Sequence, residues 1–295
     1  MKIAVYGARG FQGRLVQAEL FRRAIEPVPL GREHAAANDH RALVAAFAGC
    51  AAVINCAGPF LVSGLGPVRA AVAAGIPYVD TAGEQPHVQA VFDLVPPEAR
   101  PVVPAATDAG VPTDLLAHLV AERYGPRDTL TISHVIEGGG PSRGSLRSIA
   151  GIAGLARDGR RSSVRLPGSD RDTATVAFPL TEAVTVPRHV RIGRIDGFVG
   201  AAFGELLGSP PPAAVIDMLP EGPAEPDRRA QRFTYLVGDA VVRGFDTYGT
   251  TAVIAVEAAR RLVDTEKRGA LAPAQAFDPA DFLDFLTGHR LSWRR

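Results

Sequence analysis

Three glycines close to the N-terminus have the spacing of a phosphate-binding turn. In GARGFQG, Gly7, Gly10 and Gly13 follow an apolar run and precede a segment with helical spacing. Gly7 would allow a tight turn, Gly10 a close approach to a pyrophosphate, and Gly13 close packing of helix on strand. The spacing meets the usual G-x-G-x-x-G pattern only loosely, and a glycine turn without a ligand is the alternative. We expect a dinucleotide to bind at Gly7, Ala8, Arg9, Gly10, Phe11 and Gly13.

The end of the second predicted strand should decide which dinucleotide binds. That strand, residues 26–30, is followed by Gly31, Arg32 and Glu33. A carboxylate at this place usually binds the ribose 2′-hydroxyl of NAD, whereas a cation binds the 2′-phosphate of NADP. An arginine can also stack on adenine while it contacts the phosphate. Arg32 therefore favours NADP, and Glu33 leaves NAD as the alternative.

Two acids and a tyrosine are candidate proton donors for hydride-transfer chemistry. Asp80 and Glu84 lie at and just beyond the end of a strand predicted over residues 76–80, and doubly wound sheets bind ligands at the carboxyl ends of their strands. Tyr248 precedes an amphipathic helix in DTYGTT, where a phenol could give a proton to a developing anion. The alternatives are structural: capping or turn formation for the acids, and a hydrogen bond between domains for the tyrosine.

Polar residues that follow a glycine run at 138–140 are candidates for substrate binding. Ser142, Arg143 and Ser145 stand at a predicted helix start, where they could hold a carboxylate or a phosphate. Helix capping by the two serines is an equal alternative. His134 alternates with apolar residues on a predicted strand, which favours a satisfied, partly buried histidine over a catalytic one.

The first 126 residues show alternating signals for strands and helices. These elements must position the glycine turn and the two acids. Apolar strand signals lie at 2–6, 26–30, 51–55, 76–80 and 100–106, and helical signals between and after them lie at 11–23, 39–49, 66–75, 86–94 and 112–125. A series of this kind predicts an α/β fold with a doubly wound, Rossmann-type parallel sheet.

The pattern changes after residue 126. Residues 129–137 alternate like a half-exposed strand, and residues 233–245 resemble a hairpin that turns at Gly238 and Asp239. Residues 208–229 are rich in proline and glycine, which indicates a long loop or a lid.

These signals divide the chain into three parts. We predict a dinucleotide-binding domain over residues 1–126 and an α+β domain for substrate binding and dimerisation over residues 127–245. Residues 246–295 are predicted as helices that pack back on the first domain.

Composition narrows the class of partner. The sequence has 32 Lys and Arg residues against 31 Asp and Glu residues. This balance lacks the excess of positive charge that is typical of proteins that bind nucleic acid or an anionic membrane. Cys50 and Cys56 flank a predicted strand, which sets them too far apart for a disulfide. No signal peptide, catalytic triad or metal-ligand motif is recognisable. We expect a cytoplasmic protein without a metal, with a small-molecule substrate and a homodimeric state.

Several motifs together resemble one known family. They are GARGFQGRLV, INCAGPF, AAGIPYVDTAGE, GFDTYGTTAVIAVEAARRL and APAQAFDPADFLDFL. These motifs are similar to those of the saccharopine dehydrogenase-like (saccharopine reductase) family, which includes trans-acting enoyl reductases. The resemblance covers the first domain and the C-terminal region well and the middle loosely. It implies that Ala57, Gly58 and Pro59 lie over the cofactor, with turn packing as an equal alternative for Pro59.

Two departures from the family pattern matter. Only about twenty residues separate Gly31 from Ala51, which is room for one helix. We therefore expect the usual third strand to be missing and the adenine end of the cofactor to be more exposed. The stretch TDAGVPTD places Asp108 four residues before Pro112 rather than three, which puts a family role for Asp108 in doubt.

The sequence therefore predicts an NADPH-dependent oxidoreductase. Its reaction would be hydride transfer to a C=N, C=C or C=O group of a small metabolite. The alternative is a non-catalytic NADP-binding sensor or scaffold.

Overall fold

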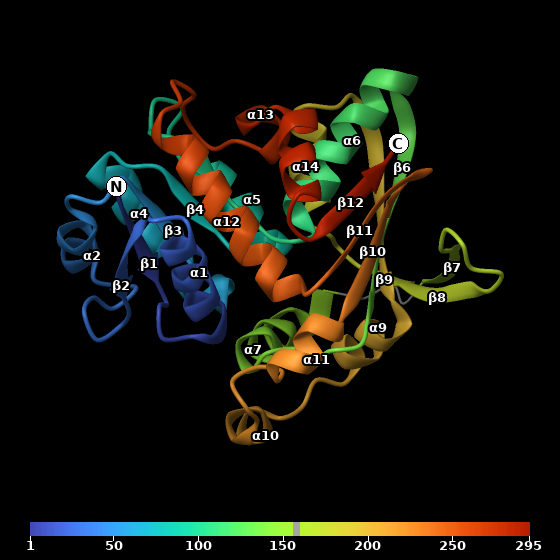
Figure 1. The fold of residues 1–295 in the computed structure, drawn as a ribbon, viewed down its shortest axis with the longest axis horizontal. Helices are drawn as coiled ribbons and strands as arrows, with labels where there is room; N and C mark the ends of the chain where they lie inside the picture. Colours follow the sequence, from blue (N-terminus) through green and yellow to red (C-terminus); the bar gives the residue numbers. More distant parts are fainter. Residues whose placement is uncertain (156–159) are drawn as a thin grey trace.

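Five short apolar strands form a parallel sheet in the N-terminal part of the chain (Figure 1). The computed structural model describes residues 1–155 and 160–295. The strands lie in the order β2-β1-β3-β4-β5 and have the bounds β1 (Lys2–Tyr6), β2 (Glu26–Leu30), β3 (Ala52–Asn55), β4 (Tyr78–Asp80) and β5 (Val102–Val103). The connecting and following helices are α1 (Phe11–Arg22), α2 (His40–Phe47), α3 (Phe60–Ser63), α4 (Leu65–Ala74), α5 (Gln85–Leu94) and α6 (Gly110–Tyr124). This architecture confirms the predicted doubly wound α/β fold.

Helices cover both faces of this sheet, which explains why its strands are apolar throughout. Ile3 and Val5 belong to a core shared with α1 and with α12 (Thr247–Val263). Ala4 and Tyr6 point the other way, into a second core shared with α2, α4 and α5. Successive residues of one strand therefore feed two different cores, as the pleat requires.

The sheet ends at β2, and two prolines supply the physical reason. The Glu26 amide donates to Met1 O at 3.1 Å, so alternate amides of β2 face β1 and the nitrogens of Pro27 and Pro29 face outward. Proline has no N–H, so the outer edge lacks the donors that a further strand would need. Among the described residues no strand pairs with this edge, which confirms the predicted loss of the third strand.

A second, mixed sheet stands beside the first (Figure 1). Its order is β12-β11-β10-β6-β9-β8-β7, and only the β6–β9 pair is parallel. The bounds are β6 (Arg127–Glu137), β7 (Arg161–Arg165), β8 (Asp172–Ala177), β9 (Ile192–Gly200), β10 (Arg232–Val237), β11 (Ala240–Phe245) and β12 (Leu291–Arg294). The hairpin of β10 and β11 turns at Gly238 and Asp239, as predicted.

Shorter helical segments connect and cover this sheet. They are α7 (Arg143–Ile152), the 3-10 helix η1 (Ala153–Leu155), α8 (Glu182–Thr185), the 3-10 helix η2 (Val186–Arg188), α9 (Ala201–Gly208), α10 (Ala213–Met218), α11 (Glu225–Ala230), α13 (Pro273–Ala276) and α14 (Pro279–Thr287). The segment 208–229, predicted as a long loop or a lid, thus contains α10 and most of α11.

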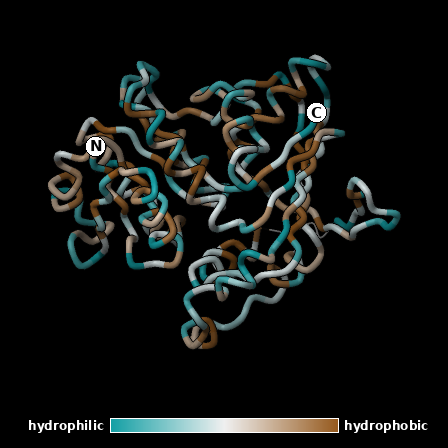
Figure 2. The backbone as a smooth tube through the Cα atoms, viewed as in Figure 1, coloured by the Kyte–Doolittle hydropathy of each residue, from teal (hydrophilic) through white to brown (hydrophobic). Residues whose placement is uncertain are grey.

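One continuous core joins the two sheets. It runs from Ile3 in β1 through Leu115 in α6 and Ile254 in α12 to Ile132 in β6 and Tyr235 in β10. Figure 2 shows hydrophobic residues recurring along these strands and helices and hydrophilic residues on the outer loops. The C-terminal segment serves both halves, because α12 packs on α1, β3 and β4 while β12 pairs with β11. Within the part of the chain described, none of the helices has the length and apolar character needed to cross a membrane.

The packing of α1 on the first strand generates a stability prediction. A Cβ at Gly13 would overlap the backbone oxygen of Gly7, so Gly13→Ala must push α1 away from β1. We expect the free energy of unfolding to fall by about 1–3 kcal/mol in urea denaturation. Gly10→Ala is the matched control, because its Cβ would meet only Gly7 O at 3.2 Å and should cost less than about 1 kcal/mol. Equal losses in the two variants would contradict the prediction.

Candidate functional site

The predicted phosphate-binding turn has the expected geometry. Gly7 adopts a left-handed φ of +83°, and a Cβ there would lie 2.8 Å from Ala57 N. The turn after β1 therefore lies directly against the loop after β3. Gly10 is the N-cap of α1, and among the atoms of the described residues a Cβ on it would come within 4 Å only of Gly7 O. The space above Gly10 is open.

The N-terminus of α1 is free to bind an anion. The amides of Phe11, Gln12 and Gly13 belong to the first turn and have no acceptor within the helix. No side chain of the described residues caps this end. Unpaired amides, a helix dipole and open space above a glycine fit the pyrophosphate of a dinucleotide.

Asn55 shapes the second loop of this site. Its buried side chain accepts a hydrogen bond from the Ala57 amide at 2.9 Å and donates one to the Tyr78 hydroxyl at 2.9 Å. The backbone of Ala57, Gly58 and Pro59 is thereby held beside the glycine turn. These three residues, named by the family resemblance, lie where a bound dinucleotide would pass.

Arg32 and Glu33, the two candidates for binding the adenosine ribose beyond the end of β2, have different surroundings. The Glu33 carboxylate pairs with Arg9 at 3.0 Å and packs against Gly31. Arg32 is exposed and has no ion-pair partner among the described residues. Arg32 can therefore pair with an added anion, whereas Glu33 already has Arg9 as its ion-pair partner.

Asp80 and Glu84 are buried and occupied with structure. The Asp80 carboxylate accepts hydrogen bonds from the Ala105 amide at 2.9 Å and the Tyr78 hydroxyl at 3.2 Å, and His87 Nε2 lies 2.8 Å away. Glu84 accepts from the Phe60 amide at 3.0 Å. These contacts tie the ends of β3, β4 and β5 together, so the geometry favours the structural alternative for both acids.

The junction of α7 and α12 brings Tyr248 together with Ser142 and Ser145, which lie far from it in the sequence. The Tyr248 hydroxyl accepts from the Ser142 amide at 2.6 Å and lies 3.0 Å from Ser145 Oγ. Ser142 also caps α7 by accepting from the Ser145 amide at 3.1 Å. The ring of Phe11 packs edge-on against Tyr248, which places this junction beside the glycine turn.

Arg143 belongs to the same junction but reaches the segment 208–229. Its guanidinium lies 3.4 Å from Glu221 and donates to Asp217 O at 3.1 Å. Glu221 also pairs with Arg14 of α1. Arg143 therefore ties this segment to α7, and Arg14 ties it to α1.

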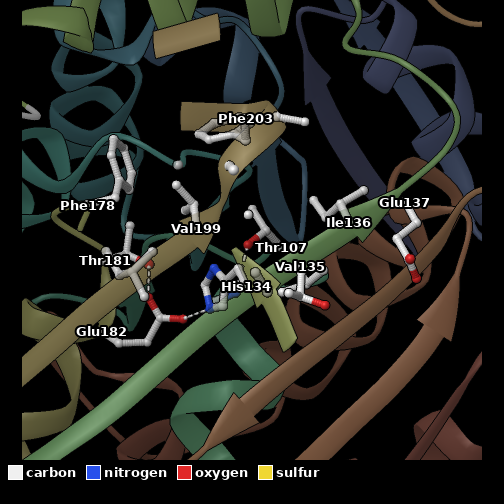
Figure 3. Close-up of a pocket in the computed structure, with 18 of the residues that line it drawn as sticks. Thr107, His134, Val135, Ile136, Glu137, Phe178, Thr181, Glu182, Val199 and Phe203 are labelled. Carbon is white, nitrogen blue, oxygen red and sulfur yellow. Dashed lines mark hydrogen bonds and ion pairs between the residues drawn. The ribbon is translucent and has the colours of Figure 1, made fainter. Parts of the chain in front are cut away.

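A pocket of about 430 Å³ lies elsewhere, between the two sheets (Figure 3). One wall consists of Gly83 after β4 and Thr107, Ala109 and Gly110 after β5. The other wall is the inner face of the second sheet and its connections, with the apolar side chains of Val135, Ile136, Phe178, Leu180, Val199 and Phe203. Asp80, Glu84, Tyr248, Ser142, Arg143 and Ser145 are not among its lining residues.

His134 and Glu182 form a close pair in this pocket (Figure 3). His134 Nε2 lies 3.0 Å from Glu182 Oε1, at ion-pair distance but off the direction of a hydrogen bond. No hydrogen-bond partner among the described residues engages the other ring nitrogen. Glu182 is fully buried and accepts from the hydroxyls of Thr113 and Thr181. Burial opposes its ionisation, but the charge of His134 and these hydrogen bonds lower its pKa overall.

Asp108 lies behind His134 and connects three elements. Its carboxylate accepts from the Tyr235 hydroxyl of β10 and from Thr251 Oγ1 of α12 at 3.0 Å. The ring of Tyr235 packs on that of His134, with 4.6 Å between the ring centroids. Burial raises the pKa of Asp108 to about 6, although its hydrogen bonds act in the opposite direction.

Sequence reasoning missed this cluster for a physical reason. His134 lies among apolar neighbours on β6, and its partner Glu182 follows 48 positions later in a short helix. Nothing in the local sequence signals that β6, α8 and the loop after β5 converge. The only available hint was the TDAGVPTD stretch, which contains Asp108.

Comparison with known proteins supports the fold. A scan against models of protein families finds no match, and a search of curated proteins finds none. Among solved structures, the apo saccharopine dehydrogenase (L-Glu forming) of Saccharomyces cerevisiae is similar over 99% of both chains, with 12% identity and a TM-score of 0.54. A probable dehydrogenase of Thermotoga maritima has a TM-score of 0.45 at 12% identity over 99% of this chain and 98% of its own. The resemblance seen in the motifs is thus confirmed at the level of the fold.

The raised pKa of Asp108 predicts a pH-dependent stability. A carboxyl group that holds its proton more tightly in the folded protein stabilises the fold at pH values below its unfolded pKa of 3.8. This stabilisation is lost as the pH rises through the folded pKa of about 6. Asp108→Asn keeps a hydrogen-bond acceptor for Tyr235. Because an asparagine does not lose a proton, the variant does not lose stability in this way as the pH rises. We expect its free energy of unfolding, relative to the parent protein, to rise by about 2 kcal/mol between about pH 4 and pH 7 in urea denaturation.

The control for this measurement is Asp239→Asn in the exposed β10–β11 turn. Its stability relative to the parent protein should be nearly independent of pH. A difference for Asp108→Asn that is equally flat would contradict the assignment of a raised pKa.

Proposed function

We propose that this protein is an NADPH-dependent oxidoreductase that transfers hydride to a C=N, C=C or C=O group of a small metabolite. One observation carries the proposal: the His134–Glu182 pair, with its carboxylate fully buried, faces a pocket at the carboxyl edge of a dinucleotide-type sheet. Catalytic sites of doubly wound folds lie at this edge. The fold of saccharopine dehydrogenase is consistent with it.

The strand order supports a path from the glycine turn to the pocket. The turn follows β1, the Ala57–Pro59 loop follows β3, and Gly83 and Thr107 of the pocket follow β4 and β5. Neighbouring strands are about 4.8 Å apart, so β1 and β4 are separated by roughly 10 Å. A dinucleotide anchored at α1 and extended along this edge would bring its far end to the pocket.

His134 and Glu182 would divide the proton chemistry between them. When bound, the reduced nicotinamide supplies a hydride to the substrate carbon. His134 would give a proton to the oxygen, nitrogen or enolate that gains the electron pair, so charge is balanced at the reacting group. Glu182 would act as a positioning residue, because its carboxylate orients the ring and stabilises the protonated form. The apolar walls would exclude water.

Arg32 favours NADPH over NADH. No acid of the described residues pairs with its guanidinium beyond the end of β2, whereas the neighbouring Glu33 is paired with Arg9. A 2′-phosphate would pair with Arg32, and a ribose hydroxyl would need Glu33 released from Arg9.

Loss of Arg32 should change cofactor preference. We expect Arg32→Ala to weaken NADPH binding about tenfold or more and NADH binding less than about twofold, measured by titration of cofactor fluorescence. Arg191→Ala, at an exposed position of the second domain, is the control and should change neither. Equal weakening of both cofactors would argue against the NADP assignment.

Loss of His134 should remove turnover without removing the cofactor. A panel of ketones, enones and cyclic imines would first identify a substrate through NADPH consumption. His134→Gln is then expected to lower kcat by about 10²–10⁴-fold and leave the Kd for NADPH unchanged. Glu182→Gln should also lower kcat and leave the Kd for NADPH unchanged, because the ring of His134 loses the carboxylate that holds it in place.

His289→Gln, in the distant α14 region, is the control for these variants. Retained turnover in His134→Gln would remove His134 from the mechanism. NADPH binding without reduction of any compound in the panel would instead favour the non-catalytic sensor.

A further inference from the structure

The segment 208–229, named the strap from here on, contacts the start of the anion-binding helix α1. A Cβ on Gly222 would lie 2.4 Å from the ring of Phe11, so the backbone of the strap packs directly on that ring. Phe11 is the first residue of α1, and its amide is one of those without an acceptor within the helix. The strap therefore borders the place where a phosphate would bind.

The same part of the strap is tied to α7. The Glu221 carboxylate pairs with Arg14 of α1 and lies 3.4 Å from the guanidinium of Arg143 of α7. The Arg143 amide donates to Glu221 O at 3.0 Å, and Arg147 pairs with Asp217 at 2.6 Å. Helix α10 of the strap also packs on α7 (Figure 1). One carboxylate thus joins α1, which follows the first strand, to α7, which follows β6.

Helix α7 also lies against the second loop of the cofactor site. A Cβ on Gly58 would lie 3.3 Å from Ser148 Oγ, so this side chain of α7 is close to the loop. A dinucleotide that starts on the glycine turn and crosses the Ala57–Pro59 loop would therefore pass beside α7. Its exchange with solvent requires room between α7 and these two loops, and the strap holds α7 and α1 together.

The strap itself is held weakly, which suits a part that moves. Of its residues, all within the described part of the chain, only Ile216 and Arg228 are buried. Arg228 pairs with the fully buried Asp246 and fixes the C-terminal end of the strap. The two ion pairs of Glu221, called the clasp, are different, because the side chains of Glu221 and Arg14 are 47% and 50% exposed. Exposed ion pairs add little stability, and segments with few buried contacts open readily.

We propose that the strap is a gate for the exchange of the dinucleotide and that Glu221 is the residue that closes it. With the clasp closed, α1 and α7 stay together beside the path of the cofactor. When the clasp breaks, the strap turns about its fixed C-terminal end and the path opens. A gate that closes over free and occupied sites alike slows entry and release by the same factor and leaves the affinity unchanged. This inference rests on the proposed function, since it takes the glycine turn as the dinucleotide site.

Removal of the clasp charge tests the gate. Glu221→Gln keeps the length of the side chain and removes its ion pairs with Arg14 and Arg143. In stopped-flow measurements of NADPH fluorescence, we expect the association and dissociation rate constants to rise together, each by about threefold to tenfold. The Kd should change by less than about twofold, because it is the ratio of two rate constants that rise by the same factor.

Glu225→Gln is the matched control. It removes the same charge from the strap, but Glu225 pairs with Arg229 one turn further along the same helix. Both rate constants should match those of the parent protein. A mere effect of charge on the cofactor phosphates would appear in both variants, and it would raise the association rate constant while lowering the dissociation rate constant.

A reversible lock on the strap gives the opposite test. A Cβ on Gly222 would lie 2.6 Å from Phe11 Cγ, so cysteines at these two positions bring their Cβ atoms within reach of a disulfide. In the double variant Phe11→Cys, Gly222→Cys, we expect the oxidised protein to exchange NADPH at least about tenfold more slowly than the same protein reduced with dithiothreitol. Each form is the control for the other, because both lack the Phe11 ring.

The outcomes separate the gate from the proposed function. Unchanged rate constants in Glu221→Gln, or faster association with slower dissociation, would overturn the gate while the oxidoreductase stands. Equal exchange by the oxidised and reduced forms of the double variant would overturn it as well. A parent protein that binds no NADPH would overturn the cofactor assignment and the gate together. Faster exchange in Glu221→Gln without reduction of any compound in the panel would support the gate and contradict the proposed reaction.

Discussion

The carboxylate of Asp108 connects the parts of the molecule on which the pocket depends. It lies in the loop between β5 and α6 and accepts hydrogen bonds from Tyr235 of the second sheet and Thr251 of α12. One buried group therefore joins the parallel sheet, the mixed sheet and the helix between them. The pKa of Asp108 is raised because burial disfavours its charged form more than the hydrogen bonds from Tyr235 and Thr251 favour it. The gain is a defined distance between the two walls of the pocket.

Around this connection, buried polar groups hold the strand ends in place. Asp80 joins the ends of β4 and β5 through the Tyr78 hydroxyl and the Ala105 amide, and Asn55 does the same for the loop after β3. Such satisfied networks give rigidity where apolar packing alone would leave loops free. The result is one edge along which the glycine turn after β1, the Ala57–Pro59 loop and the His134–Glu182 pair follow one another. A rigid edge suits hydride transfer, which needs close alignment of cofactor and substrate.

The sequence predicted the architecture well wherever the structure of an element depends on residues within that element. Apolar runs bounded by glycine located β1 to β4, and the glycine spacing located the start of α1. The short connection after Gly31 predicted the missing third strand, and Pro27 and Pro29 explain it. The roles of Asp80 and Glu84 were less accessible. A carboxylate at a strand end can face substrate or satisfy backbone amides, and only its surroundings distinguish the two.

The sequence by itself determined the order of strands and helices, the glycine turn after β1 and the end of the sheet at β2. Each of these depends on backbone conformation or on hydrogen-bond donors within a few residues. The tertiary structure alone decided which polar residues meet. His134 and Glu182 are 48 positions apart, and Asp108, Tyr235 and Thr251 come from three elements. Their proximity arises from the packing of α6 and α12 between two sheets. Long-range contacts of this kind leave no periodic trace in the chain, so the His134–Glu182 pair became visible only in the fold.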